Sequence, residues 1–488
     1  MYSDGKLWIA KGDEKVYLLP KYANRHGLIA GASGTGKTVT IKVMAESFSA
    51  MGVPVFMTDV KGDVSGLCRA GKDSDSMQKR IKTLGVDGFS YKGFPCEFWD
   101  IYGENGHPVR TTVDDMGPDL LTRIMGLSEV QEDVLRMVFR ICRDEGWELI
   151  DTKDIKAAVG FIQEHRKEYE EEYGLMSAQS LGAIQRSVMS LEDAGGDIFF
   201  GEPSLDIEDW FETGEDGSGT INILNCVKLA HNPRLYSTFI VWLLNKLFTV
   251  LPEVGDMDKP KLVFFFDEAH MLFSDAPPVM VQKVEQVVKL IRSKGVGIYF
   301  ISQSPSDIPD SVLAQLSNRI QHALRAYTPK ERKAVKTAAE TFRPNPKFDT
   351  SEVIMELGTG EALVSFLDEK GRPGIVERAF ILPPQSFLGQ ISDDDYRAMV
   401  YGSALDEKYR ERVDNYTAYE ALADLKEKKA EEAEKKAKET EKEKARSGGS
   451  SGKKKSSYTK KMADRTVGNA ASAIGRGLGN MISKKLFR

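Results

Sequence analysis

The apolar residues near the start of the chain fall into short runs and one helical pattern. The runs KLWIA, VYLLP and HGLIAG, within residues 7–30, predict short strands that lead into a glycine-rich loop. In TVTIKVMAESFSAMG the apolar residues from Ile41 to Met51 recur at helical spacing. VPVFMTDVKGD (53–63) predicts an apolar strand that ends in Asp59 and is followed by a turn. Strand, loop, helix and strand in this order form the βαβ unit of a parallel sheet.

The middle of the chain has a different pattern. Within residues 110–200, three helical patterns follow one another: DLLTRIMGLSEVQEDVLRMVFRICRDEG, IKAAVGFIQEHRKEYEEEYG and SAQSLGAIQRSVMSLEDAG. A strand pattern returns with TINILNC (220–226), and the apolar helix RLYSTFIVWLLNKLFTVL precedes the strand KLVFFFDEAH (261–270). The helices are therefore predicted to be an insertion that interrupts the sheet.

The last third of the chain returns to strands and then loses its apolar character. A helix over 279–294 is predicted to lead to the apolar strand GIYFISQS, and residues 361–382 predict a β-hairpin with a Gly-Arg-Pro turn. KEKKAEEAEKKAKETEKEKAR (426–446) predicts a mixed-charge helix or coil, and SGGSSGKKKSS is typical of a flexible linker.

Composition narrows the class of protein. The 488 residues are 41% apolar and 29% charged, as in an ordinary globular protein, and no apolar run approaches the ~20 residues of a membrane span. The N-terminus lacks the apolar core of a signal peptide. The four cysteines are scattered without a C-x-x-C pair, which argues against zinc and disulfides and predicts a cytoplasmic protein.

Charge is unevenly distributed along the chain. The net charge is −6, yet residues 447–488 carry ten Lys/Arg and one Asp, so residues 1–446 carry about −15. A net negative charge over residues 1–446 is not typical of a protein that binds DNA over its outer surface. DNA held in a narrow basic channel remains compatible with it.

The sequence GASGTGKT fits the phosphate-binding pattern G-x-x-x-x-G-K-[ST]. Its glycines let backbone N–H groups converge on phosphate oxygens at the positive end of the following helix. Lys37 is predicted to contact the β- and γ-phosphates, and the Thr38 hydroxyl to ligate Mg²⁺. The residues predicted to bind the nucleotide, ATP, are Gly31, Ala32, Ser33, Gly34, Thr35, Gly36, Lys37, Thr38 and Val39.

Two later strands end in polar residues that suit hydrolysis. In FFFDEAH, Asp267 is predicted to hold Mg²⁺ through water and Glu268 to polarise the attacking water. A glutamate directly after the aspartate distinguishes ATPases that hydrolyse water from many kinases; by itself the motif could be a strand ending in an acidic turn. Gln303 ends the next strand, where an amide can contact the γ-phosphate and the water, or can simply be a satisfied polar residue.

Several motifs in order carry a family resemblance: NRHGLIAGASGTGKT, TDVKGD, FFFDEAH, IRSKGVGIYFISQSPSDIP, QLSNRIQHALRAYTPKERKAV and GTGEALVSFLDEKGRP. Over roughly residues 5–385, and more weakly in the basic C-terminal segment, the chain resembles the HerA/FtsK group of P-loop motor ATPases. Within that group it is most similar to the bacterial HerA-like branch with a helicase HerA-like C-terminal domain (YjgR-like).

The resemblance implies a RecA-like core that assembles as a ring, a hexamer, with ATP between neighbouring subunits. Arg25, in NRHG, matches the arginine that reaches the neighbour's nucleotide, and Arg292 matches a second arginine before the sensor strand. Gln303 matches the sensor glutamine. Arg319 and Arg325 are further candidates at the subunit interface. The alternative for Arg25 is a surface charge that positions the loop.

Two departures from the group limit what is carried over. Ile291 stands where the group usually has glycine before the second arginine. Few residues precede the glycine loop, so the N-terminal barrel domain of archaeal HerA is not expected, and neither is a role in DNA end resection. A DNA-reading winged helix is not apparent at the C-terminus.

Together these observations predict an α/β fold: a RecA-like P-loop NTPase core with a mainly parallel central sheet, a helical insertion and a charged, partly disordered C-terminal tail. The predicted segments are the first part of the core (1–105), the helical insertion (106–215), the rest of the core (216–395), a charged helical extension (396–446) and a basic tail (447–488).

The predicted function is a Mg²⁺-dependent ATPase that moves on DNA as a ring. The alternative is an ATP-driven regulatory or remodelling ring acting on a protein partner, bound through the helical insertion or the tail. His270 is expected to support the site rather than to catalyse. Lys61 and Asp63 are interpreted equally as residues that face the ring channel or as a simple turn.

Overall fold

The glycine-rich loop joins a central strand to a buried helix. In the computed structural model, which describes residues 1–255, 257–273 and 278–447, β4 (Gly27–Ala30) leads through the loop into α1 (Lys37–Ala50), and β5 (Val55–Asp59) follows. The ring of Phe48, on α1, packs 6.2 Å from the ring of Phe265 and 6.1 Å from that of Tyr299. This apolar contact fixes α1, and with it the loop, against the sheet.

The described strands form one 13-stranded sheet. A parallel part runs in the order β11-β4-β10-β9-β5-β8-β6-β7, and the antiparallel strands β12, β13, β2 and β1 extend it beyond β11, with β3 paired to β2. The sheet therefore confirms the predicted α/β class with a mainly parallel centre. The remaining strands are β1 (Tyr2–Ser3), β2 (Lys6–Lys11), β3 (Lys15–Leu18), β6 (Cys96–Asp100), β7 (His107–Pro108), β8 (Ile221–Asn225), β9 (Leu262–Phe266), β10 (Val296–Ser302), β11 (Asn318–Gln321), β12 (Glu361–Ser365) and β13 (Glu377–Ile381).

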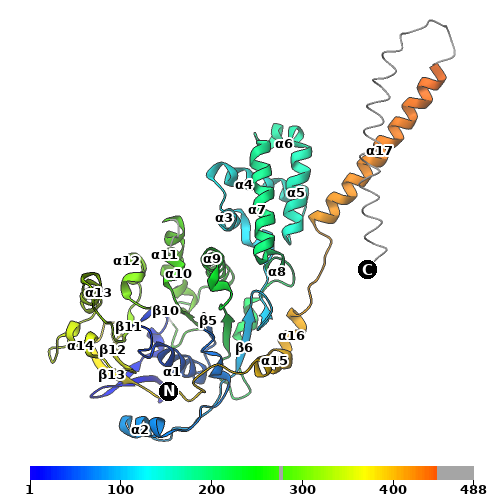
Figure 1. Ribbon diagram of the computed structural model, residues 1–488. Helices are drawn as coiled ribbons and strands as arrows, with labels where there is room; N and C mark the ends of the chain where they lie inside the picture. The colour runs from blue at the N-terminus through cyan, green and yellow to red at the C-terminus, as the bar shows by residue number, and fades with distance from the viewer. Residues whose placement is uncertain (256, 274–277, 448–488) are drawn as a thin grey trace. The chain divides into compact units, whose positions relative to one another are not determined.

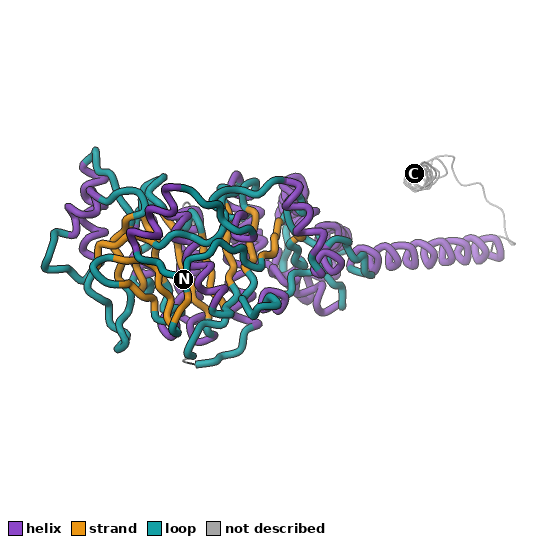
Figure 2. The backbone as a smooth tube through the Cα atoms, turned by 90° about the horizontal axis from the view of Figure 1, so that it is seen from below, coloured by secondary structure: helices purple, strands orange, loops and turns teal. Residues whose placement is uncertain are grey.

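Helices surround the strands, which lie in the middle of the fold (Figure 2). The helices after α1 are α2 (Asp75–Leu84), α3 (Val113–Met125), α4 (Glu129–Glu145), α5 (Thr152–Glu164), α6 (Arg166–Tyr173), α7 (Ala178–Leu191), α8 (Asp197–Phe199), α9 (Pro233–Val250), α10 (His270–Phe273), α11 (Pro278–Leu290), α12 (Asp310–Leu313), α13 (Pro329–Glu340), α14 (Thr350–Glu356), α15 (Asp393–Gly402), α16 (Ala404–Tyr409) and α17 (Ala418–Ser447). Figure 1 shows α3 to α7 gathered into one group away from the strands. These five helices lie within residues 106–215, the segment predicted to be the helical insertion.

The helical insertion contains more helices than the three patterns predicted. The first pattern breaks at Gly126, which ends α3 in the left-handed region at φ 65°, and Ser128 then begins α4 with a capping box. The second breaks at His165, between α5 and α6. The helix predicted over 279–294 is also shorter, because α11 ends at Leu290 and a 3₁₀ turn, η6 (Ile291–Lys294), follows.

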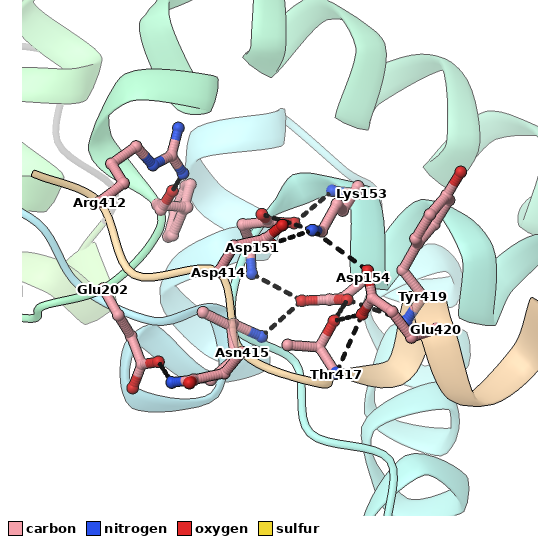
Figure 3. Close-up of polar contacts among 12 residues, drawn as sticks. Asp151, Lys153, Asp154, Glu202, Arg412, Asp414, Asn415, Thr417, Tyr419 and Glu420 are labelled. Carbon is pink, nitrogen blue, oxygen red and sulfur yellow. Dashed lines mark hydrogen bonds and ion pairs between the residues drawn. The ribbon is translucent and has the colours of Figure 1, made fainter. Parts of the chain in front are cut away.

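The chain returns to the helical insertion near its C-terminal end. We call residues 410–420 the C-terminal strap. The Thr417 hydroxyl and, at 3.0 Å, the Tyr419 amide both donate to the buried carboxylate of Asp154, while the Lys153 ammonium lies 2.7 Å from Asp414 (Figure 3). The strap therefore fastens α5 to the segment that follows α16.

The described chain divides into two units, Met1–Leu422 and a second unit that begins at Ala423. The mixed-charge segment predicted as helix or coil is helical, as part of α17. The basic tail predicted for residues 447–488 lies, from residue 448 on, outside the described residues. Across the described ranges, none of the helices has the length and apolar character to cross a bilayer.

Candidate nucleotide-binding site

The carboxyl ends of four parallel strands meet at one edge of the sheet, here called the carboxyl edge. Strand register sets Ser302 of β10 opposite Ala30 of β4, Phe300 of β10 opposite Phe266 of β9, and Met57 of β5 opposite Phe265. The loops after β4, β5, β9 and β10 therefore leave the sheet side by side. Open parallel sheets bind ligands in the crevice outside these strand ends.

The glycine loop lies against residues from far along the sequence. A Cβ on Gly31 would come within 2.5 Å of the Cβ of His322, so this position has room for glycine alone. Gly36 caps α1 with φ 116°, in a region that disfavours side chains. The Gly360 amide donates to the Thr35 carbonyl at 3.0 Å. Ala32 accepts from the Thr35 hydroxyl at 2.7 Å, Ser33 and Gly34 are exposed at the tip, and Val39 is half-buried on α1.

Lys37 begins α1, and its side chain folds back over the loop. Its ammonium donates to the carbonyls of Gly31 at 2.5 Å and Ala32 at 3.2 Å. Burial lowers the pKa of Lys37, and the nearby charge of Lys61 lowers it further. The helix N-terminus beside it has unpaired N–H groups that suit an anion, so the lysine and the loop together form a phosphate cradle.

Oxygen atoms suited to a hard divalent cation gather next to Thr38. The Thr38 hydroxyl donates to Asp63 Oδ2 at 3.0 Å. Burial raises the pKa of Asp267 to about 6 and that of Asp59 to about 7, and each has a further carboxylate neighbour that raises it. Mg²⁺ is usually held by one or two carboxylates, with waters and substrate phosphates completing its shell. The residues fit this pattern, although the described chain contains no group of three or more side chains arranged to hold a metal by themselves.

Glu268 follows Asp267 with φ 47°, an unusual conformation for a residue other than glycine. Its Oε1 lies 2.7 Å from the Lys61 ammonium, and its Oε2 lies 3.3 Å from His270 Nδ1. Burial favours the neutral acid, but Lys61, followed by His270 and Lys37, outweighs burial and lowers the pKa of Glu268. The carboxylate is therefore ionised, as a proton acceptor must be.

Gln303 lies at the end of β10, beside the segment that carries Glu268. The Ala269 amide donates to the Ile301 carbonyl at 2.8 Å, so the two strand ends are in direct contact. Ser302 donates to Asp307 at 2.6 Å, which fixes the turn after β10, while the Gln303 side chain is exposed. The position suits an amide that contacts a bound nucleotide.

Arg25 and Arg292 lie at the opposite, amino edge of the parallel sheet, where β4 and β10 begin. Between them is His26, fully buried, whose Nε2 donates to the Val288 carbonyl at 2.7 Å and whose Nδ1 accepts from the Ile298 amide at 3.0 Å. Burial lowers the pKa of His26 to about 4, with both arginines adding to the shift. The histidine is thus neutral and connects the segments that carry the two arginines.

Arg319 and Arg325 are engaged within the chain. The Arg319 guanidinium donates to the carbonyls of Leu316 at 2.9 Å and Leu313 at 3.1 Å. That of Arg325 donates to the carbonyls of Met355 and Leu357. These contacts stabilise the turns around β11 and α14, and an interface role for either residue stays a prediction.

Sequence reasoning missed several contacts of the site. Lys61 and Asp63 were interpreted as channel-facing or as a plain turn, whereas they contact Glu268 and Thr38. His322, which packs behind the loop and contacts the Thr40 hydroxyl at 2.8 Å, gave no signal. The one available signal was TDVKGD itself, because charged residues directly after an apolar strand lie at the carboxyl edge.

The fold and the site together define a P-loop NTPase. The chain belongs to the family described as "Helicase HerA-like C-terminal", which it matches over residues 6–488, and this confirms the resemblance inferred from its motifs. It is therefore a P-loop ATPase of the helicase type.

Two curated relatives are both described as "DNA double-strand break repair helicase HerA". The one from Sulfolobus acidocaldarius is 21% identical over 400 residues, covering 80% of this chain and 70% of the relative. The one from Sulfurisphaera tokodaii is 21% identical over 430 residues, covering 85% and 76%. Among solved structures, the bacterial conjugative coupling protein TrwB has a TM-score of 0.50 at 15% identity, over 79% of this chain and 91% of that one. At that identity the similarity concerns the fold alone.

Proposed function

We propose that this protein is a Mg²⁺-dependent ATPase that assembles as a ring, a hexamer, and couples ATP hydrolysis to movement on DNA in the cytoplasm. The proposal rests on one observation: the residues predicted to act on ATP lie at two opposite edges of the sheet. The phosphate cradle and Glu268 lie at the carboxyl edge, and Arg25 and Arg292 lie at the amino edge.

Hydrolysis needs a bound phosphate, a proton acceptor and a group that senses the product. The loop amides and the Lys37 ammonium bind the phosphates, and Thr38 and Asp267, with Asp63 beside Thr38, hold Mg²⁺. Mg²⁺, when bound, neutralises charge on the phosphate oxygens. Glu268 accepts the proton of the attacking water, and Gln303 contacts the terminal phosphate from the adjacent strand end.

The position of the arginines supports assembly. The four residues of β4 span about 13 Å at roughly 3.3 Å per residue, so Arg25 lies on the far side of the sheet from its own phosphate cradle. A neighbouring subunit that packs its amino edge on this carboxyl edge supplies both arginines to the bound ATP. Charge in the transition state is then neutralised in trans, and hydrolysis depends on the ring.

DNA as the substrate is supported by the relatives, which are described as DNA repair helicases. An acidic body of about −15 disfavours DNA binding over the outer surface and is compatible with DNA held in an inner channel. The second candidate is a ring that remodels a protein partner. It is favoured by exposed apolar side chains on the helical insertion, Val130 at 67% and Leu175 at 85% exposure.

DNA stimulation of the ATPase separates the two candidates. We expect duplex or single-stranded DNA to raise the steady-state rate, and the logarithm of the DNA affinity to fall linearly with the logarithm of salt concentration. The Lys37→Ala variant, tested under the same conditions, should show no stimulated rate. A rate that is indifferent to every nucleic acid would contradict the motor and favour the protein-remodelling ring.

A further inference from the structure

Lys61 makes a close contact with the proposed proton acceptor from a different strand. It lies in the turn after β5, and its ammonium is 2.7 Å from Glu268 Oε1. The lysine side chain is 44% exposed, whereas that of Glu268 is 9% exposed. The ion pair therefore lies at the mouth of the site, with the carboxylate inside and the ammonium towards solvent.

The turn that carries Lys61 is fixed by the strand before it. Asp59 Oδ1 accepts from the Gly62 amide at 2.7 Å, and Asp59 Oδ2 accepts from the Val64 amide at 3.3 Å. Gly62 has φ 78°, which the turn requires. With the backbone held at both sides, only the four-carbon stem of Lys61 is free to change its direction.

The ion pair opposes the chemistry proposed for Glu268. A carboxylate oxygen that already accepts a charge-assisted bond from an ammonium is a poorer acceptor for the proton of water. The other oxygen, Oε2, is buried and lies 3.3 Å from His270 Nδ1, a contact that does not meet the geometry of a hydrogen bond. Until the ammonium leaves, Lys61 covers the oxygen at the open side of the site.

A terminal phosphate gives the ammonium a better partner. Lys61 contacts Glu268, and the charges of both residues act on Lys37: Lys61 lowers the pKa of Lys37, and Glu268 raises it. Like charges at short range repel, and an anion placed between them removes the repulsion. Lys37 is expected to contact both the β- and γ-phosphates, and ADP lacks only the γ-phosphate, so ATP alone would place that additional anion near the two lysines.

We propose that Lys61 is a positioning residue that covers Glu268 in the nucleotide-free subunit and moves to the γ-phosphate when ATP binds. Glu268 is then uncovered only when there is a bond to hydrolyse. When inorganic phosphate leaves, Lys61 returns to the carboxylate. This inference rests on the proposed ATPase function, because it assigns the event that makes Glu268 available.

The test compares triphosphate with diphosphate binding in the Lys61→Met variant, which keeps an unbranched side chain of similar length to the lysine stem and removes the ammonium. We expect the affinity for a non-hydrolysable ATP analogue to fall by about tenfold, and the affinity for ADP to change by less than about twofold, since ADP does not reach Lys61. In steady state, KM for ATP should rise more than kcat changes. Lys61→Arg keeps the charge and should restore most of the discrimination between the two nucleotides.

The matched control is Lys347→Met, which removes a lysine from an exposed ion pair with Asp13 far from the site and should leave both affinities unchanged. Equal weakening of ATP analogue and ADP, or a loss of kcat with KM unchanged, would overturn the inference. A wild-type protein that neither binds nor hydrolyses ATP would instead refute the proposed function. Thermal unfolding of each variant without nucleotide shows whether a change in affinity comes from misfolding.

Discussion

At the carboxyl edge of the sheet, the functional side chains contact one another within a single chain, whereas at the amino edge two arginines are arranged around a buried histidine. Lys37 is held by loop carbonyls, Thr38 by Asp63, and Glu268 by Lys61. His26 links the starts of β4 and β10, beside Arg25 and Arg292. The charged side chains of the carboxyl edge contact one another, whereas the two arginines of the amino edge are half-buried, and Arg25 lies 5.9 Å from the centroid of the Tyr22 ring. If Arg25 and Arg292 act on bound ATP as proposed, a catalytic cycle uses edges from two subunits.

The largest expected effect comes from removing the proton acceptor at the carboxyl edge. Glu268→Gln should retain binding of an ATP analogue and lose turnover by about 10²–10⁴-fold, as expected for a general base. Steady-state hydrolysis and equilibrium nucleotide binding measure the two properties separately. Glu356→Gln, at an exposed position in α14, is the control and should behave as wild type. Unchanged turnover in Glu268→Gln would remove this residue from the mechanism.

Mixing subunits tests whether the two edges act on each other. Arg25→Ala and Lys37→Ala proteins should each be inactive as pure preparations, because one lacks the cation and the other the phosphate contact. In an equimolar mixture about one interface in four combines an intact Lys37 with an intact Arg25, so up to about a quarter of the wild-type rate should return. The mixed assembly must be verified by native mass measurement. If verified mixed rings stay inactive, Arg25 does not act in trans.

The smallest effect concerns stability and compares the buried histidines of the two edges. Burial lowers the pKa of both His26 and His322 to about 4, from 6.5. As the pH falls, each histidine is protonated in the unfolded chain before it is protonated in the folded chain. The stabilisation is therefore fully present above about pH 6.5 and is lost as the pH falls towards 4. The full loss per histidine is about 3 kcal/mol, from 1.36 kcal/mol for each unit of pKa difference.

Chemical denaturation at pH 7.5 and pH 5.0 measures the part of this loss that is present at pH 5.0, about 2 kcal/mol for each histidine. His26→Gln and His322→Gln should each be less stable than wild type at pH 7.5, and each should lose less stability on acidification. Wild type and both variants responding equally to pH would show that neither histidine is buried as the neutral form. A reduced pH response in one variant alone would show that only the histidine replaced in that variant is buried in its neutral form.

The two edges also differ in how far sequence predicts them. Apolar patterns in the sequence predict the strands β4, β9 and β10 and the helix α1 at their observed positions. The glycine loop can be recognised because its motif residues lie next to one another in the sequence. β11 was not predicted, because NRIQ contains one apolar residue and has no pattern of its own. It becomes a strand because β4 and β12 pair with it on both sides.

Contacts across strands were beyond sequence reasoning for the same reason. Lys61 and Glu268 are in contact because β5 pairs with β9, and nothing local in TDVKGD specifies that neighbour. That the charges of Arg25 and Arg292 both act on His26 likewise requires β4 to lie beside β10. The insertion was recognised from its helical pattern, but its breaks at Gly126 and His165 depend on capping and on packing between helices.

The C-terminal strap has a consequence for the order in which the protein is made. Asp154 accepts a hydrogen bond from Thr417, which lies 263 residues later in the chain. The helical insertion is therefore synthesised well before Thr417. At roughly 5–20 residues per second, that interval is on the order of 13–50 s. During synthesis α5 therefore carries a carboxylate that lacks two of its hydrogen bonds until residues 417 and 419 have been made. A nascent chain truncated before residue 417 would lack these hydrogen bonds to Asp154, even if its ATPase core were complete.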